Sequence, residues 1–248
     1  MDDLLMKTML EVDEHHWWYR GRRRVIRAEL DRLALPADAL VLDAGCGSGR
    51  TMEDLVRYGQ VHGVEVDPDA TEIARARGVG EVRNGRLEAL PFDDATFDLI
   101  TCLDVLEHVP DDRVALEELR RVCKPAGWLL ATVPAYPALW SLHDRSNHHY
   151  RRYERRTLRE AAVDAGWIVR RMTFFFSFLL APAALVRLAQ RRRAEDGYKP
   201  NLTIGPEWLN TMLEQPLRIE ASWLARGATL PAGLSLLALF QNPGAPTA

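Results

Sequence analysis

A glycine-rich turn directly after a short apolar run is the feature that most constrains this chain. Residues 41–49 read Val-Leu-Asp-Ala-Gly-Cys-Gly-Ser-Gly, and a helix-like segment begins at Arg50. Glycines allow a sharp strand-to-helix turn and let a ligand lie directly against backbone N–H groups. The spacing is GxGxG, residue 50 is Arg where the dinucleotide pattern has its last glycine, and no Walker lysine follows. The turn therefore argues against a nucleoside triphosphate and makes a dinucleotide less favoured.

A second apolar run ends in an acidic residue at the distance that an adenosine ligand requires. The segment 61–68 reads Val-His-Gly-Val-Glu-Val-Asp-Pro, and Glu65 follows Gly45 by twenty residues. At this distance a carboxylate after the second strand can reach both ribose hydroxyls. Glu65 is therefore the predicted ribose acceptor.

Strand-like and helix-like segments alternate through the middle of the chain. The predicted strands are 40–43, 61–66, 81–84, 97–103 and 128–133, and the predicted helices are 50–58, 69–77 and 111–122. The run 97–103 is continuously apolar, which is typical of a parallel strand buried on both faces. This alternation predicts an α/β fold with a doubly wound parallel sheet.

The flanks extend this core. Residues 3–35 are expected to be largely helical with a break around 15–19, and a helix at 156–165 precedes strands at 168–176 and 235–240. About fifty residues separate these last two strands, which is far more than a hairpin needs and predicts a helical insertion. The expected segments are a helical cap 1–36, a ligand-binding core 37–177, an insertion or lid 178–228, and a last strand with a disordered tail 229–248.

Four sequence blocks resemble the class I S-adenosylmethionine-dependent methyltransferases. VLDAGCGSGR and VHGVEVDP resemble their first two motifs, LPFDDATFDLITCLDVLEHVPDD (90–112) the fourth-strand motif, and VCKPAGWLLATVP (122–134) the fifth strand with its preceding turn. The chain is most similar to small-molecule members such as the ubiquinone-biosynthesis O-methyltransferases. Its flanks resemble bacterial methyltransferases of polysaccharide and lipid-linked pathways. The resemblance implies a Rossmann-like sheet of seven strands with an antiparallel last strand, S-adenosyl-L-methionine as cofactor and S-adenosyl-L-homocysteine as product.

The resemblance also assigns the residues that would hold the cofactor. They are Arg20, Asp43, Gly45, Cys46, Gly47, Gly49, Glu65, Val66, Leu87 and Leu103. Asp43 would orient the turn and bond the ligand's amino group, Val66 would pack on the adenine, and Leu87 would offer its backbone N–H to the ring. Arg20 would pair with the ligand's carboxylate from an N-terminal helix.

One position departs from the family pattern. Arg86 stands where many relatives have an acidic residue that accepts a hydrogen bond from the adenine amino group, and arginine cannot accept one. Either Glu88 takes this role, or backbone and stacking contacts alone hold the adenine.

Candidate catalytic residues follow the fifth strand, where this fold presents its acceptor. The polar and aromatic side chains there are Tyr136, Trp140, His143, Asp144, His148, His149, Tyr150 and Tyr153. O-methylation benefits from a base near the acceptor hydroxyl, and histidine titrates in the useful range. His143 is the first candidate and His148 the second. The alternative is that these histidines cap helices or bond backbone groups.

The motif Asp-x-x-Glu-His at Asp104, Glu107 and His108 has two interpretations. Some relatives with Glu-x-x-Glu-His bind a divalent metal there, and these residue types are suitable ligands. The sequence Leu-Glu-His also occurs in relatives that use no metal. We expect structural support beneath the methyl-transfer site and no metal.

The net charge and the cysteines limit the classes of binding partner and the cellular location that we expect. The net charge is −3, and no Asn/Asp-Pro-Pro-Tyr/Phe signature follows the fourth strand, so nucleic acid is not expected. Three cysteines without CxxC spacing and no visible signal peptide suggest a cytoplasmic protein.

The apolar run 174–186 has arginines on both flanks and is too short to span a bilayer. Either it packs as core and lid, or 174–193 makes peripheral membrane contact.

The function predicted from the sequence is therefore S-adenosylmethionine-dependent O-methylation of a small or lipid-linked acceptor, such as a glycan, polyprenyl or natural-product compound. The alternatives are C-methylation of a quinone-like acceptor and a non-catalytic cofactor-binding partner protein. The sequence leaves the acceptor and the oligomeric state open.

Overall fold

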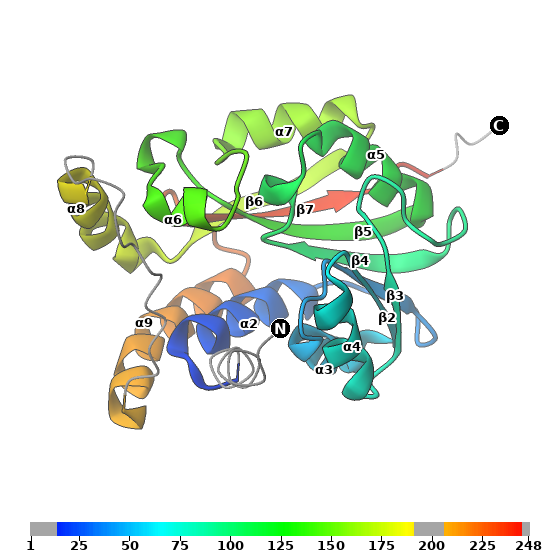
Figure 1. The fold of residues 1–248 in the computed structure, drawn as a ribbon, viewed down its shortest axis with the longest axis horizontal. Helices are drawn as coiled ribbons and strands as arrows, with labels where there is room; N and C mark the ends of the chain where they lie inside the picture. The colour runs from blue at the N-terminus through cyan, green and yellow to red at the C-terminus, as the bar shows by residue number, and fades with distance from the viewer. Residues whose placement is uncertain (1–13, 191–205, 245–248) are drawn as a thin grey trace. The chain divides into compact units, whose positions relative to one another are not determined.

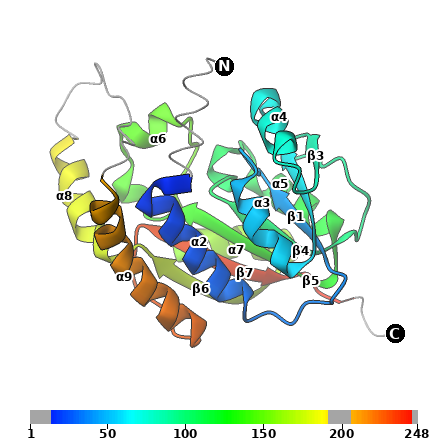
Figure 2. The ribbon, with the colours of Figure 1, turned by 90° about the horizontal axis from the view of Figure 1, so that it is seen from below.

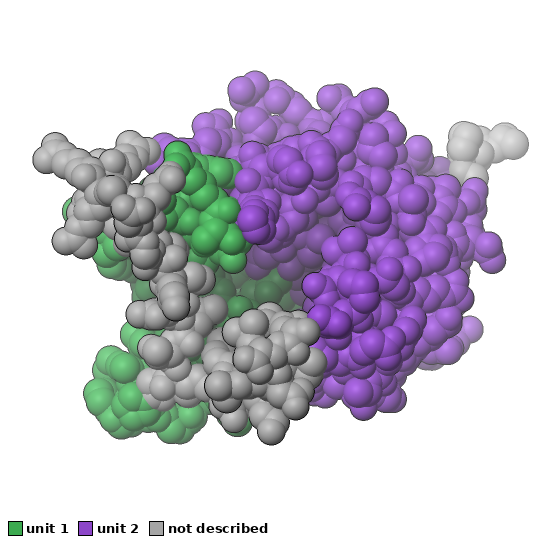
Figure 3. All heavy atoms as spheres, in the orientation of Figure 1, with its two compact units in different colours: residues 1–34, 139–147, 174–234 green, residues 35–138, 148–173, 235–248 purple. Residues whose placement is uncertain are grey.

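The computed structural model describes residues 14–190 and 206–244. Their contacts divide the chain into two compact units (Figure 3). The first unit comprises the described residues of segments 1–34, 139–147 and 174–234, and the second those of segments 35–138, 148–173 and 235–248. Most of the predicted core 37–177 thus belongs to the second unit.

In the described part of the chain, seven strands form one sheet in the order β3-β2-β1-β4-β5-β7-β6 (Figure 1). The strands are β1 (Leu40–Ala44), β2 (Gln60–Glu65), β3 (Glu81–Asn84), β4 (Phe97–Leu103), β5 (Cys123–Pro134), β6 (Ile168–Phe175) and β7 (Ser235–Gln241). Strands β1 to β5 pair in parallel, and β7 pairs antiparallel with β5. This confirms the predicted seven-stranded Rossmann-like sheet with an antiparallel last strand.

Helices of the second unit cover both faces of this sheet. They are α3 (Arg50–Leu55), α4 (Pro68–Ala76), α5 (Asp112–Val122) and α7 (Arg155–Asp164), with short 3₁₀ turns η1 (Val56–Tyr58) and η2 (Leu106–His108). The helices α3 and α4 lie on one face, and α5 and α7 lie side by side on the other (Figures 1 and 2). Helix α4 begins at Pro68 because the Asp67 side chain accepts a hydrogen bond from the Ala70 N–H at 3.0 Å.

The strand order positions the site. From β1 the chain runs outward to β2 and β3, and it then returns to the other side of β1 as β4. Loops leaving the carboxyl ends of β1 and β4 therefore diverge to opposite faces and leave a crevice between them. The glycine turn follows β1, at this topological switch point.

The first unit is mainly helical. Its helices are α2 (Trp17–Leu30), α6 (Leu142–Ser146), α8 (Leu180–Gln190) and α9 (Glu207–Ala225), and the 3₁₀ turns are η3 (Pro137–Leu139), at its edge, and η4 (Ser177–Leu179). Helices α2 and α9 pack so closely that a Cβ on Gly21 would lie 2.0 Å from Cδ1 of Leu217. The buried carboxylate of Glu214 adds ion pairs to Arg20, at 2.9 Å, and to Arg24. Helices α8 and α9 confirm the predicted helical insertion.

Three local expectations differ from the structure. The expected helix break around 15–19 is confined to His16. This residue caps α2, which begins at Trp17, because its Nδ1 accepts a hydrogen bond from the Trp18 N–H. Strand β5 begins five residues earlier than expected, because a register shift opposite β4 accommodates the Pro125–Gly127 turn signal. Asn242, expected to begin the disordered tail, is buried, and its side-chain amide donates to the carbonyl oxygen of Cys123 at 2.8 Å.

The apolar run singled out in the sequence divides between two elements. Its first part completes β6, where Phe174 and Phe175 are buried, and its second part forms α8. Among the helices that the structure describes, none is long and apolar enough to cross a membrane.

Candidate functional site

The glycine turn after β1 needs its glycines for backbone conformation. Gly45, Gly47 and Gly49 have φ angles of +79°, +54° and +78°, which lie in the left-handed region that side chains disfavour. The N–H groups of Gly45 and Cys46 donate to the carbonyl oxygen of Val64 at 2.8 and 3.1 Å, which ties the turn to β2. A Cβ on Gly47 would meet no atom within 4 Å. The turn therefore has open space beside the partly exposed backbone of Gly47.

The carboxylate of Glu65 is held in one orientation at the end of β2. It accepts hydrogen bonds from the backbone N–H groups of Gly47 at 2.8 Å, Val66 at 2.9 Å and Asp67 at 3.1 Å. Three donors fix both carboxylate oxygens before any ligand binds. Oε1 accepts from Val66 and Asp67 and Oε2 only from Gly47, so Oε2 keeps a lone pair to accept from a ligand hydroxyl.

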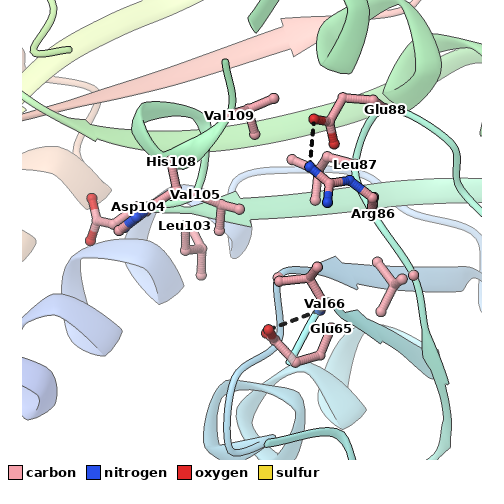
Figure 4. A pocket seen from close by; sticks show the side chains of 13 residues that line it. Glu65, Val66, Arg86, Leu87, Glu88, Leu103, Asp104, Val105, His108 and Val109 are labelled. Carbon is pink, nitrogen blue, oxygen red and sulfur yellow. Dashed lines mark hydrogen bonds and ion pairs between the residues drawn. The ribbon is translucent and has the colours of Figure 1, made fainter. Parts of the chain in front are cut away.

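A cavity of about 340 Å³ lies in the second unit beside the turn and this carboxylate (Figure 4). It is lined by Gly45, Val64, Glu65, Val66, Gly85, Arg86, Leu87, Glu88, Leu103, Asp104, Val105, His108 and Val109. The lining comes from β2, β4 and the loops that follow β1, β2, β3 and β4. A volume of this size is suitable for a nucleoside-sized ligand.

Five of the ten predicted cofactor residues line this cavity: Gly45, Glu65, Val66, Leu87 and Leu103. Four others, Asp43, Cys46, Gly47 and Gly49, build the turn behind it. Asp43 is 2% exposed, and its Oδ1 accepts a hydrogen bond from the Thr101 hydroxyl at 2.7 Å. The structure thus gives Asp43 a role in joining β1 to β4.

Arg20 lies in the first unit, on α2. Its guanidinium forms ion pairs with Glu207 at 2.7 Å and with Glu214 at 2.9 Å. These two carboxylates account for its charge within that unit, so its assignment to a ligand carboxylate stays a prediction.

The position that departs from the family pattern lies at the cavity wall. Arg86 extends beside Glu88 with 3.4 Å between guanidinium nitrogen and carboxylate oxygen, and both line the cavity (Figure 4). Leu87 between them is buried. The Glu88 carboxylate therefore lies at the cavity wall, where it can accept a hydrogen bond from a bound ligand. Its ion pair with Arg86 offsets the negative charge of this carboxylate.

The loop that carries these residues is anchored to α5. The Glu118 carboxylate accepts from the Leu90 N–H at 2.8 Å and forms an ion pair with Arg121 at 2.7 Å. The hydrogen bond from the Arg121 guanidinium lowers the pKa of Glu118 and keeps it ionised. Arg121 also donates to the carbonyl oxygens of Leu90 and Phe92 at 3.1 and 2.9 Å. This wall of the cavity is consequently fixed by charge-assisted hydrogen bonds.

A cluster that the sequence did not bring together lies on the opposite wall. Glu107, His108 and His149 offer ligand atoms that all lie within 4.8 Å of one another. The rings of His108 and His149 meet edge to face with centroids 4.6 Å apart. Glu107 is buried, while His108 is exposed and lines the cavity. The three side chains could hold a divalent cation, in addition to the supporting role expected for the motif.

The segment carrying His149 is fastened to the loop after β4. The N–H of Tyr150 donates to the carbonyl oxygen of Glu107 at 2.7 Å, and the hydroxyl of Tyr153 donates to Asp112 at 2.7 Å. Burial, followed by the Asp112 charge, raises the pKa of Tyr153. Its hydroxyl therefore stays protonated and keeps this contact. The sequence places His149 among the candidates after the fifth strand but does not join it to His108, since only tertiary contacts bring the two together.

The two histidines predicted as bases occupy different places. His148 is exposed in the second unit, with a left-handed φ of +56°, and does not line the cavity. His143 lies on α6 in the first unit, where the Asn147 amide nitrogen is 3.1 Å from its Nε2. Their catalytic role stays a prediction. His108 is the histidine that lines the cavity among the residues described.

The three cysteines are free and buried, as expected for reduced thiols. Burial raises the pKa of Cys46 and of Cys102, and the nearby carboxylates of Asp43 and of Glu65 or Glu107 add to the effect. Both sulfur atoms are therefore protonated at neutral pH and poor nucleophiles.

Comparison with known proteins agrees with this geometry. Residues 42–131 match the family model described as a methyltransferase domain. The ubiquinone biosynthesis O-methyltransferase of Xanthomonas oryzae pv. oryzae is 34% identical over 46% of this chain and 56% of its own length. The chain thus spans about half the length of the curated relatives it matches.

Solved structures share the fold over nearly the whole chain. A methyltransferase from Haloferax volcanii, in complex with the Trm112 methyltransferase activator, covers 99% of this chain and 97% of its own, with a TM-score of 0.65 and 20% identity. Phosphoethanolamine N-methyltransferase 2 of Haemonchus contortus, in complex with S-adenosyl-L-methionine, covers 91% of this chain and 53% of its own, with a TM-score of 0.60 and 14% identity. Residues 42–131 are therefore similar to a methyltransferase domain, and the chain shares the fold of these solved methyltransferase structures.

Proposed function

We propose that this protein transfers a methyl group from S-adenosyl-L-methionine to an oxygen atom of a small or lipid-linked acceptor. The observation that carries the proposal is the fixed Glu65 carboxylate beside a glycine turn and a cavity of about 340 Å³. When bound, S-adenosyl-L-methionine supplies an electrophilic methyl group on a sulfonium centre. The domain match and the O-methyltransferase relative support the reaction class.

The residues present fit the adenosine part of this ligand. Glu65 would accept a hydrogen bond from a ribose hydroxyl through Oε2, because three backbone donors already hold its carboxylate in place and leave that oxygen one acceptor site. Leu87 and Leu103 would give the adenine apolar contacts, and the exposed side chain of Val66 would cover its other face. The open space beside Gly47 would admit the ligand against the backbone.

The acceptor side of the proposal rests on His108. Its side chain is exposed, lines the cavity and lies edge to face against His149. A histidine here can take a proton from an acceptor hydroxyl near neutral pH. His143 and His148 remain the alternatives that the sequence favours. Methyl transfer from the sulfonium sulfur to the acceptor oxygen also depends on alignment and exclusion of water, so removing one base need not abolish it.

The test is methyl transfer by the purified chain to a panel of hydroxylated acceptors, including catechol-type compounds and polyprenyl-linked hydroxylated compounds. Formation of S-adenosyl-L-homocysteine together with a methylated product supports the proposal. Methylation at carbon would instead establish the quinone-type alternative, since an acidic carbon needs a base as a hydroxyl does. Cofactor binding without turnover on any acceptor would favour the non-catalytic alternative.

Three matched variants identify the base. His108→Asn is expected to reduce kcat by about a hundredfold, the usual contribution of one general base, while the cofactor affinity changes little. His143→Asn and His148→Asn are the controls. If His108→Asn keeps full activity and either control loses it, the base is the histidine that the sequence favours.

A further inference from the structure

Helix α9 presents an apolar stripe to solvent. Trp208, Met212, Ile219 and Trp223 are 68%, 54%, 56% and 51% exposed. Pro216 lies inside the helix between Met212 and Ile219, and by helical position the spacings of four, eleven and fifteen residues place all four on one side, since an α-helix advances 100° per residue. Large exposed side chains aligned in this way mark an interaction site more often than scattered ones do.

The opposite side of α9 holds the helix in place without the stripe. Leu217, Ala221 and Leu224 are buried there. Two buried carboxylates add fixed contacts, because Glu214 pairs with arginines of α2 and Glu220 accepts from two backbone N–H groups at the start of η4. The stripe is therefore not required for packing within its unit.

Exposed arginines border the stripe. Arg218 lies on α9 beside the buried Glu214, at 3.3 Å, and Arg24 of α2 reaches the same carboxylate. Arg226 is exposed at the C-terminal end of α9, in line with Trp208 by helical position. Glu214 is buried, and the exposed Glu207 beside Trp208 is paired with Arg20 at 2.7 Å, so the unpaired charge that α9 shows to solvent along this edge is mainly positive. This contrasts with the net charge of −3 of the whole chain.

We propose that the outer face of α9, defined by Trp208, Met212, Ile219 and Trp223, docks onto the surface of an anionic lipid bilayer. Fifteen residues separate the two tryptophans, or about 22 Å along the helix, so both can enter the headgroup region when α9 lies flat. Tryptophan is suited to this boundary because its ring is apolar and its N–H remains polar. Arg218 and Arg226 would contact lipid phosphates.

This proposal concerns α9 and does not depend on methyl transfer. The segment 174–193, for which the sequence leaves peripheral membrane contact open, ends before α9 begins. A bilayer accounts for both the apolar stripe and its cationic border. A second copy of the chain would need to offer a complementary acidic border, and it is therefore an outcome that the test must separate.

The test is co-sedimentation of the full chain with vesicles of phosphatidylcholine alone and of phosphatidylcholine mixed with phosphatidylglycerol. Binding to the anionic vesicles that weakens with salt is expected. Trp208→Ser with Trp223→Ser should reduce the bound fraction by about tenfold or more, since most of the buried apolar area is lost. The matched control is Val56→Ser with Val163→Ser, which removes equally exposed apolar side chains from the other unit and should leave binding unchanged.

A second measurement keeps the assignment testable if the serine variant folds poorly. Brominated lipid should quench the tryptophan fluorescence of the bound protein. Trp208→Phe with Trp223→Phe should still bind, but with most of this quenching lost, because the quenched rings have been replaced by other apolar rings.

Three outcomes would overturn the proposal. They are equal binding to neutral and anionic vesicles, unchanged binding of the serine variant, and unchanged quenching of the phenylalanine variant. A concentration-dependent dimer that the serine substitutions abolish, with no vesicle binding, would assign the face to a second copy.

Discussion

Replacing Gly45 by alanine should test how the glycine turn is built. The φ of +79° costs an L-residue about 1–2 kcal/mol. The new Cβ would lie 2.5 Å from Cγ2 and 2.9 Å from Cγ1 of Val105, an overlap that costs about another 1–3 kcal/mol. We therefore expect Gly45→Ala to lower the free energy of unfolding by about 2–5 kcal/mol.

A double-mutant cycle separates the two contributions. Val105→Ala removes both methyl groups that the new Cβ would meet, while its own Cβ, at 3.2 Å, remains. In the Gly45→Ala background it should restore about 1–2 kcal/mol relative to additive behaviour. Gly47→Ala is the matched control, since its Cβ meets nothing within 4 Å and only the left-handed φ is penalised, at about 1–2 kcal/mol.

Urea unfolding followed by circular dichroism measures all four changes. The reasoning is refuted if Gly45→Ala costs no more than Gly47→Ala. It is also refuted if Gly45→Ala and Val105→Ala are additive, because the steric term would then be absent.

Two further predictions concern buried polar groups. Burial raises the pKa of Glu220 above 4.5. The contribution of this group to the free energy of unfolding is therefore fully present below pH 4.5 and is lost as the pH rises through the raised folded-state pKa. Glu220→Gln should remove this pH dependence from urea unfolding, and an unchanged pH profile would contradict the prediction. Tyr153→Phe should lower the free energy of unfolding by about 1–2 kcal/mol, since the Tyr153 hydroxyl donates to Asp112 at 2.7 Å. Tyr150 is exposed, so Tyr150→Phe should change the free energy of unfolding by less than about 0.5 kcal/mol. Equal effects of the two substitutions would contradict a stabilising role of the Tyr153 hydrogen bond.

Most of the second unit could be predicted because its signals are local. The run 97–103 became β4 without a change of boundary, and the turn and Glu65 lie beside the cavity as expected. Apolar runs, glycines and capping residues act within a few positions, so the sequence alone indicates them. The start of β5 was missed because the shift in its pairing with β4 depends on the neighbouring strand.

The parts that could not be predicted depend on tertiary contacts. His149 joins Glu107 and His108 only through backbone pairing of the segment that carries it, and no local pattern marks that pairing. The stripe on α9 has the same origin, since which face of an amphipathic helix stays exposed is decided by what it packs against. Asn242 likewise became ordered through contacts with the first residues of β5.

The most direct test of the account is calorimetric titration of the chain with S-adenosyl-L-methionine and with S-adenosyl-L-homocysteine. The account predicts binding of both with Kd values in the micromolar range. Glu65→Gln should weaken both by about tenfold or more, because hydrogen bonds to a charged acceptor are lost. Absence of binding by a correctly folded chain, or binding that Glu65→Gln leaves unchanged, would contradict the assignment of this cavity to the methyl donor.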